Sequence, residues 1–287
     1  VPEGVSLGIN VMGEITVRVG FNLQGQGQYT LAAQLLADYF GVEMSAVRVV
    51  YADTDNAPPH FGPGGSRLGV AISGAILGAC HTITEKLRRV AAVLLQAPFE
   101  QVELMDGMLR VRGVPGAQMP MAQVVGALLS RSDLLPPGME ASASTTSVWT
   151  APGRTAPDED GRCKSYLTAA NACHVVLVEL DPETGKTDIL KYFIADDCGT
   201  RLNPATVEGM IQGGVAQGVG AALLEQYVYD ENAQPLVSTF MDYLMPTINE
   251  VPMTEKSALV TPSPFAPLGA KGCGEGAIHT TPAAVIC

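Results

Sequence analysis

The sequence predicts an α+β protein, with strands and helices in one chain but without the strict strand–helix–strand repeat of a parallel α/β fold. Residues 5–11 and 15–21 alternate apolar and polar side chains, which is the period of a half-buried strand. Residues 29–40 carry apolar side chains at helical spacing, and residues 68–95 form a long run of small and apolar residues. We therefore expect layers of strands and helices.

The first half begins with paired strands. They should turn at Gly13 and Glu14, Gly41 should cap the first helix at its C-terminus, and Asp106 with Gly107 suits a hairpin turn. The predicted elements are strands over 5–11 and 15–21, a helix over 29–40, a strand over 47–51, a Pro- and Gly-rich loop over 52–67, a helix over 68–95, a hairpin of strands 102–105 and 109–112, and a helix over 121–130.

A boundary between two lobes is predicted near residue 150. Residues 133–162 are rich in Pro, Ser, Thr and Ala, so we expect a linker there, which divides the chain into domains over residues 1–150 and 151–287. The predicted elements of the second domain are strands over 173–180 and 187–194 joined by a turn over 181–186, and a helix over about 206–225. That helix carries five glycines, which indicates close packing against a neighbour.

Composition and charge exclude several classes of protein. The 287 residues include 17 basic and 29 acidic ones, and a net charge of −12 gives no electrostatic basis for binding nucleic acid. The longest weakly polar stretch, residues 68–80, falls short of the roughly 18–20 residues that span a bilayer, so we expect no transmembrane helix. A charged fraction of only 16% and 31 glycines predict a large contact with other chains.

The cysteines and histidines do not form a metal-binding pattern. Six cysteines occur without any C-x-x-C pair, which argues against an iron–sulfur cluster or zinc ribbon within this chain. We expect free, buried thiols in a reducing compartment, and with no targeting signal in the sequence we expect a cytoplasmic protein. The histidines show no ligand spacing, and residues 53–56 are expected to form a turn held by Asp side chains.

Three segments combine glycine with polar side chains, at residues 25–28, 62–67 and 269–276. Each could place backbone N–H groups against an anionic ligand. A plain turn is the better explanation of any one segment alone, but three of them in one chain favour ligand loops. In the last segment Glu275 stands between two glycines. Its carboxylate could act as a base in an apolar setting, or it could simply complement the dipole of a following helix, and spacing alone favours neither.

Six segments taken in order resemble the second molybdenum-binding region of the molybdenum hydroxylases, the family of xanthine dehydrogenase, aldehyde oxidase and aerobic carbon monoxide dehydrogenase large subunits. The segments are Gly25-Gln26-Gly27, Tyr51-Ala52-Asp53-Thr54-Asp55, Gly64-Gly65-Ser66-Arg67, Asp197-Cys198-Gly199-Thr200-Arg201-Leu202-Asn203-Pro204, Met241-Asp242-Tyr243-Leu244-Met245-Pro246-Thr247 and Gly269-Ala270-Lys271-Gly272-Cys273-Gly274-Glu275. Gly-Ser-Arg at 65–67 and Thr-Pro-Ser-Pro at 261–264 look most like the carbon monoxide dehydrogenase-like bacterial branch.

The resemblance implies two α/β lobes that bind a molybdopterin cofactor, in bacteria usually its cytosine dinucleotide form. The cofactor-binding residues it implies are Gln26 and Gly27 at the pterin, Gly65, Ser66 and Arg67 near the phosphates, and Lys271, Gly272, Cys273 and Gly274 facing the metal. No protein ligand to molybdenum is implied. Glu275 occupies the position of the catalytic base, which takes a proton while oxygen from water reaches an electron-poor carbon and hydride leaves it. Because pairing with a lysine would weaken such a base, we expect Lys271 to point away from Glu275.

The resemblance also implies partners. The first molybdenum-binding region of the family is absent from this sequence, so we expect about half of a split catalytic subunit whose partner chain carries that region. The [2Fe-2S] clusters and FAD of the family are expected on further partner subunits. One departure is Met210, where the family often has glutamine; Gln212 could compensate, or the alignment slips.

The predicted function is that of a molybdenum-dependent oxidoreductase, active only with its partners, that hydroxylates an N-heterocycle or oxidises an aldehyde. One alternative is a noncatalytic structural half-subunit. Another is part of a carbon monoxide dehydrogenase. The substrate itself is not predictable from these residues, since the groups that select it lie mostly in the absent region.

Overall fold

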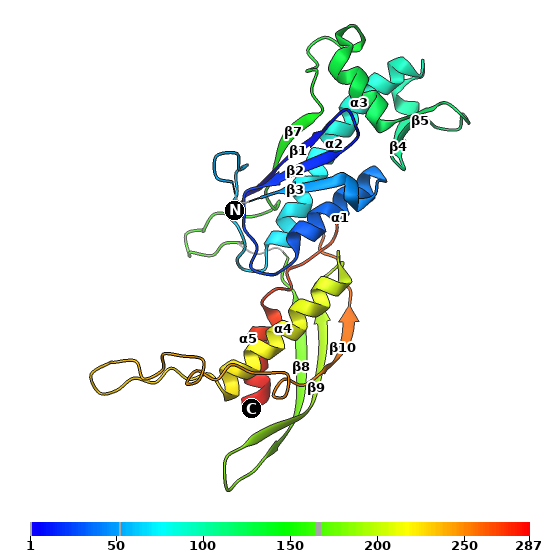
Figure 1. Cartoon of the computed structure of the whole chain (residues 1–287). Coiled ribbons are helices and arrows are strands. Elements are labelled where there is room, and N and C mark those ends of the chain that lie inside the picture. The colour runs from blue at the N-terminus through cyan, green and yellow to red at the C-terminus, as the bar shows by residue number, and fades with distance from the viewer. Residues whose placement is uncertain (1, 52, 165–167) are drawn as a thin grey trace. The chain divides into compact units, whose positions relative to one another are not determined.

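The computed structural model describes residues 2–51, 53–164 and 168–287; Ala52, the first residue of the predicted loop over 52–67, lies outside them. Internal contacts divide the chain into two compact units (Figure 1). The first comprises Val1–Gly64 and Leu68–Gly153. The second comprises Gly65–Arg67 and Arg154–Cys287. The short segment of residues 65–67 therefore contacts the second unit although its neighbours in sequence belong to the first.

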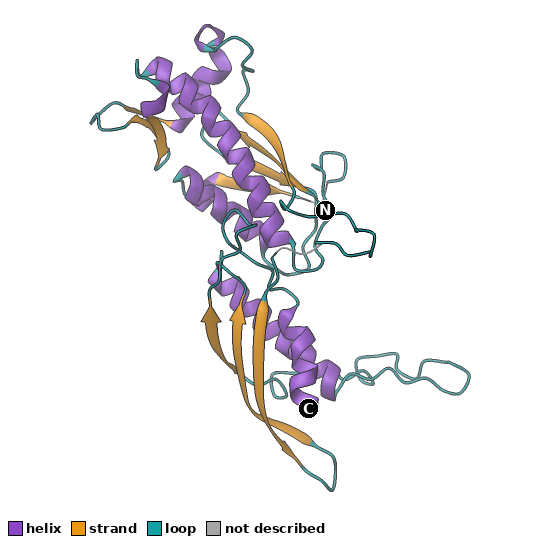
Figure 2. Ribbon diagram, turned by 180° about the vertical axis from the view of Figure 1, so that it is seen from behind, coloured by secondary structure: helices purple, strands orange, loops and turns teal. Residues whose placement is uncertain are grey.

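The first unit is built on a four-stranded sheet with strand order β3-β2-β1-β7. Its strands are β1 (Glu3–Ile9), β2 (Ile15–Val19), β3 (Val47–Val50) and β7 (Ser144–Trp149). β1 pairs antiparallel with β2 and β7, and β3 is parallel to β2. Alternate side chains such as Val5, Leu7 and Val17 are buried, so one face of the sheet forms the core, and the helices α1 (Gln28–Phe40) and α2 (Leu68–Leu94) pack on it (Figure 2). The predicted opening of two strands, a helix and a strand is confirmed.

Gly41 caps α1 as expected. Its φ of 65° is left-handed, and a Cβ there would overlap the backbone of Asp106, so only glycine fits this close approach. The predicted hairpin is β4 (Val102–Met105) and β5 (Met108–Val111), and the predicted short helix is α3 (Met121–Ser130). The remaining elements of this unit are β6 (Gln118–Pro120) and three 3₁₀ turns, η1 (Met44–Ala46), η2 (Phe99–Gln101) and η3 (Ser132–Leu134).

Strand β7 corrects the prediction of an irregular linker over residues 133–162. It forms the edge of the main sheet and lies against α2, where a Cβ at Gly74 would stand 2.5 Å from the Trp149 ring and one at Gly78 would stand 2.5 Å from Ser147 Oγ. The strand is missed because it packs small polar side chains against helix glycines, so it lacks the apolar alternation that signals a strand.

The second unit has a three-stranded sheet, β10-β9-β8, with two helices on one face. Its elements are β8 (Asn171–Leu180), β9 (Thr187–Asp197), α4 (Pro204–Leu223), β10 (Thr254–Leu259) and α5 (Gly276–Ile286). The β8–β9 hairpin and α4 are confirmed. β10, which is parallel to β9, was not predicted because it is an edge strand with five exposed residues out of six and no buried alternate positions.

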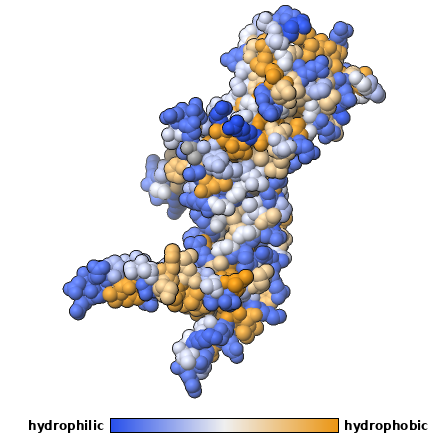
Figure 3. Space-filling model, in the orientation of Figure 1, coloured by the Kyte–Doolittle hydropathy of each residue, from blue (hydrophilic) through white to orange (hydrophobic). Residues whose placement is uncertain are grey.

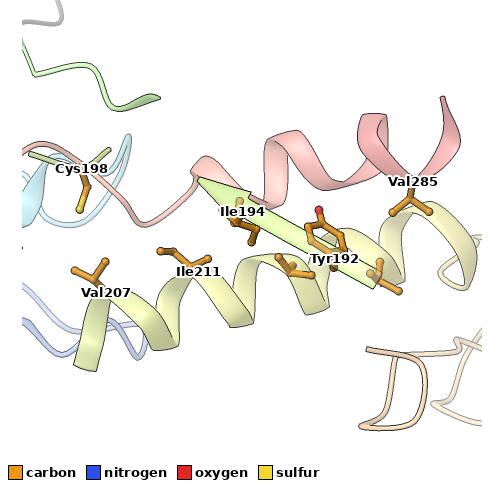
Figure 4. Close-up of a cluster of buried hydrophobic side chains, with 9 residues drawn as sticks. Tyr192, Ile194, Cys198, Val207, Ile211 and Val285 are labelled. Atoms are coloured by element: carbon orange, nitrogen blue, oxygen red, sulfur yellow. The ribbon is translucent and has the colours of Figure 1, made fainter. Parts of the chain in front are cut away.

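The core of the second unit lies between β9, α4 and α5 (Figure 4). Its largest buried side chain is Tyr192, packed with aliphatic residues of α4 such as Ile211. The predicted close packing of the α4 glycines is confirmed at Gly214 and Gly218. A Cβ on Gly214 would lie 2.8 Å from Ala277, and one on Gly218 would overlap Thr281.

Among the described residues, one helix, α2, has the length and composition to cross a bilayer. This differs from the expectation based on residues 68–80, because the helix continues to Leu94 and includes an apolar window of 18 residues with at most two charged side chains. However, 67% of its most apolar window is buried inside the unit, as in the core helix of a globular domain. All six cysteines are free, and the expected burial holds for Cys80 and Cys198 but not for Cys163, Cys173 and Cys287.

Candidate active site

The glycine-rich segment before α5 contacts Ser66. The Ser66 hydroxyl accepts a hydrogen bond from the Glu275 backbone N–H at 3.0 Å. Gly272 lies so close that a Cβ there would stand 2.5 Å from the Ser66 carbonyl oxygen, and one on Gly274 would lie 3.5 Å from the Ser66 Oγ. The structure thus brings together two of the segments that the resemblance assigned to the cofactor site, although 209 positions separate Ser66 from Glu275.

Glu275 is the N-cap residue of α5, and its side chain is exposed. It makes no side-chain capping hydrogen bond to the helix, and no ion pair among the described residues includes it. The carboxylate is therefore available to a ligand in this chain. Its surroundings here are not the dry pocket that a base near neutrality needs, so exclusion of water has to come from outside these residues.

Lys271 points away from Glu275, as expected. Its Nζ lies 3.2 Å from Asp197 Oδ2, and both side chains are only 9% exposed. Hydrogen bonds from Thr261, from the Gly199 backbone N–H and from Lys271 hold the pKa of Asp197 well below its usual range, despite burial. Asp197 was quoted within a motif but given no role by sequence reasoning. A carboxylate at the end of a strand was the available signal.

Backbone contacts fasten the same segment to the end of β9. Lys271 N–H donates to the Cys198 carbonyl at 2.7 Å, and Gly199 forms a bridge with Ala270. Next to them Asp196 and Arg201 form a buried ion pair at 2.6 Å. The segment of residues 269–275 is thus held by side chains and backbone together, and Glu275 is its last residue.

A cavity of about 210 Å³ lies beneath this segment. Cys198 and Cys273 lie side by side in its wall, and their hydrogen bond together with burial raises the pKa of the Cys273 thiol. His174 Nδ1 is 2.8 Å from the Tyr192 hydroxyl, which in turn donates to Thr281. Burial lowers the pKa of His174. The Cys273 side chain packs against the core of the second unit.

The other predicted site residues make local hydrogen bonds or lie in turns. Gln26, in the first unit, folds its side-chain oxygen onto the Gln24 N–H at 2.9 Å, and Gly27 caps α1 with a left-handed φ of 76°. Gly65 and Ser66 both have left-handed φ values, 60° and 53°. Arg67 follows them, half-buried.

Other expectations concern turns and amide groups. The predicted Asp turn is confirmed, since Asp53 accepts from the Asp55 backbone N–H and from the Asn56 side chain. Within the described part of the chain, no three His, Cys, Asp or Glu side chains are grouped as a metal ligand set. Gln212 bonds to the Pro252 carbonyl and to Thr254, so its amide connects α4 to β10, and Met210 packs against the core.

The family model for the molybdopterin cofactor-binding domain matches residues 1–252. The chain belongs to this family. It is a molybdenum hydroxylase family member by its relatives as well as by its fold.

The large subunit of nicotine 6-hydroxylase from Paenarthrobacter nicotinovorans is 34% identical over 96% of this chain and 32% of that protein. The carbon monoxide dehydrogenase large chain of Hydrogenophaga pseudoflava is 31% identical over 99% of this chain and 34% of that protein. The crystal structure of quinoline 2-oxidoreductase from Pseudomonas putida 86 matches with a TM-score of 0.87 and 37% identity, over 99% of this chain and 34% of that one. The chain thus spans about a third of these relatives.

The groups in the second unit of this molybdopterin cofactor-binding domain fit such a cofactor. Gly274 and Gly276 are exposed and carry no side chain, and a Cβ on Gly276 would meet nothing within 4 Å, so a ligand can approach the main chain closely beside Ser66. The backbone N–H groups of this segment and the Ser66 hydroxyl are hydrogen-bonding groups, which suit pterin and phosphate oxygens and not direct metal ligation.

Proposed function

We propose that this chain forms one part of the molybdenum-binding subunit of a hydroxylase, with Glu275 as its general base. The reaction is the hydroxylation of an N-heterocycle or the oxidation of an aldehyde, with water as the oxygen source. The observation that carries the proposal is the exposed Glu275 carboxylate, free of any described cation, on a segment that Ser66 and Asp197 fix from two sides.

This chain's residues bind and orient the cofactor, and one of them moves a proton. Gln26 and Gly27 contact the pterin, Gly65–Arg67 lie near the phosphates, and the backbone of residues 271–274 faces the metal end of the cofactor. When bound, the cofactor supplies an oxygen atom derived from water and accepts two electrons. The Glu275 carboxylate takes up the proton released in that step.

Charge around the base supports this role. The nearest cation in the segment, Lys271, is neutralised by Asp197, so it does not form an ion pair with the Glu275 carboxylate. A carboxylate in such an ion pair would have a lower pKa and would be a weaker base. Proton uptake by Glu275 is favoured when the rest of the enzyme shields its carboxylate from water.

The cofactor is proposed to be the cytosine dinucleotide form of molybdopterin, shared with a region that corresponds to the rest of the relatives' length. That region, on a partner chain or elsewhere in the same polypeptide, includes the first molybdenum-binding region. The [2Fe-2S] clusters and FAD are proposed to reside on partner subunits, and the complex to be cytoplasmic.

An exposed apolar surface supports a large contact with that region. Between α4 and β10 the second unit carries a long segment without helices or strands, and apolar patches appear on this unit's surface (Figures 1 and 3). On this segment Phe240, Met241, Ile248 and Met253 are between 79% and 90% exposed. Side chains of this size are seldom left in water together, so we infer that the rest of the molybdenum-binding subunit covers them.

The test is Glu275→Gln in the purified complex. The variant keeps the size and hydrogen bonding of the side chain but cannot accept the proton, and turnover should fall by roughly 100-fold or more, as for loss of a general base. Molybdenum content and assembly should match the wild type. Glu255→Gln, an exposed glutamate on β10, is the matched control and should keep full activity.

The result separates the alternatives. Wild-type turnover in Glu275→Gln with a full complement of molybdenum would show that the carboxylate is idle and would favour a noncatalytic structural half. Turnover on carbon monoxide in place of a heterocycle or an aldehyde would assign the complex to the carbon monoxide dehydrogenases.

A further inference from the structure

Ser66 is placed to hold the base in position. We propose that the Ser66 hydroxyl is a positioning group for Glu275, through a hydrogen bond to the backbone at the start of α5. The inference rests on the proposed function, since it concerns how Glu275 is aimed. It also ties residues 65–67, near the proposed phosphate contacts, to the residue that takes the proton.

The first argument is that few contacts fix Glu275. Its side chain makes no capping bond and no described ion pair, so its direction depends on its backbone. Within the described residues, the Glu275 backbone makes two hydrogen bonds: its carbonyl accepts from the His279 N–H, and its own N–H donates to Ser66 Oγ. Removing the hydroxyl therefore leaves Glu275, the N-cap residue of α5, without this long-range hydrogen bond.

The second argument is that the segment is shaped to receive Ser66. A Cβ on Gly272 would stand 2.6 Å from the Ser66 Cβ and 2.5 Å from its carbonyl oxygen, so backbone and serine pack in direct contact. Gly274 approaches the same hydroxyl. Two glycines within three residues therefore allow the hydroxyl to reach the Glu275 N–H.

The third argument is the backbone of Ser66 itself. Its φ of 53° is left-handed, a conformation that a residue with a Cβ adopts at a cost and that glycine adopts freely. A serine at this position is strained where its neighbour Gly65 is not. The serine hydroxyl supplies a hydrogen-bond acceptor for the Glu275 N–H, which a glycine would lack.

The experiment compares Ser66→Ala and Ser66→Gly in the holoenzyme complex. Both remove the hydroxyl, but only the glycine variant relieves the left-handed backbone, so an effect shared by both variants belongs to the hydroxyl. We expect kcat to fall roughly fivefold, the change that corresponds to one hydrogen bond, with KM within about twofold and molybdenum content unchanged. Backbone amides of residues 273–277 should exchange with deuterium several-fold faster. Ser257→Ala, on β10, is the control and should change neither kcat nor the rate of deuterium exchange.

A double variant separates positioning from general support of the fold. In the Glu275→Gln background, the residual turnover should not fall further when Ser66→Ala is added, because Ser66 acts through the carboxylate. An unchanged kcat in both Ser66 variants, or a further equal loss in the Glu275→Gln background, would overturn the inference while leaving the base in place. Full turnover in Glu275→Gln alone would instead overturn the proposed function.

Discussion

The buried ion pair between Asp197 and Lys271 should contribute strongly to the stability of the second unit. Asp197→Ala removes the acceptor of Lys271 Nζ at 3.2 Å and of the N–H groups of Gly199 and Thr261 at 2.9 and 3.1 Å. Both charged side chains are 9% exposed, so Lys271 would be left as a buried, unpaired cation. Breaking such a pair from one side costs about 3–5 kcal/mol.

The assay is hydrogen exchange of the peptides that contain residues 196–201 and 269–275. A loss of about 3 kcal/mol corresponds to roughly a 100-fold loss of protection in these peptides. The pKa of Asp197 is lowered in the folded chain, so its contribution is present above the unfolded pKa near 3.9 and is lost as the pH falls through the lower folded value. Measurements near pH 7 therefore see the full effect.

Two further variants decide whether the effect belongs to the pair. Asp197→Ala combined with Lys271→Met should cost less than the sum of the single changes, because the cation left without a partner is gone. Asp188→Ala breaks a pair with Lys186 that is shorter, at 2.8 Å, but exposed, and it should change protection little. Strictly additive single effects, or an equally large effect of Asp188→Ala, would refute the reasoning.

Three more outcomes follow from the structure. Gly218→Ala should destabilise the protein by about 1–3 kcal/mol because its Cβ would overlap Thr281. Gly213→Ala, whose Cβ would meet nothing within 4 Å, should stabilise α4 by up to about 1 kcal/mol. Thermal unfolding should show Tm shifts of opposite sign for the two variants, and shifts of the same sign would contradict the packing. Burial lowers the pKa of His174, so the folded state binds fewer protons and stability should fall as the pH drops from the ordinary value of 6.5 toward the lower folded one; a Tm series should show this slope, and the slope should be smaller in His174→Gln. Phe240→Ser should weaken association with the rest of the molybdenum-binding subunit without lowering the Tm of this chain, and unchanged association would show that this surface is not covered by it.

Local sequence patterns predicted the elements that obey them. The β1–β2 hairpin alternates cleanly, Gly41 marks the end of α1, and the turn before Thr187 carries Gly185 in a left-handed conformation, so each of these was predictable from neighbouring residues. Edge strands β7 and β10 were missed. β7 is stabilised by pairing with β1 and by contact with the glycines of α2, and β10 by pairing with β9. Neither strand has an apolar period in its own sequence.

The candidate site could be predicted only in part. The resemblance named Ser66 and Glu275, but spacing gave no reason to expect a hydrogen bond between residues 209 positions apart. Asp197 had no visible role until the fold placed Lys271 beside it. The site roles of Gln26, Gly27, Gly65 and Arg67 and the domain boundary near residue 150 stay predictions, because their test is a bound cofactor or an isolated domain.

The most direct test of the central claim is to purify the native complex that contains this chain, identify its polypeptides, and measure molybdenum and iron per copy. The proposal predicts about one molybdenum and, for two [2Fe-2S] clusters, about four irons per complex, together with sequence that corresponds to the other two-thirds of the relatives. A chain that purifies without molybdenum and without that sequence would contradict the proposed cofactor site and the role of Glu275 with it.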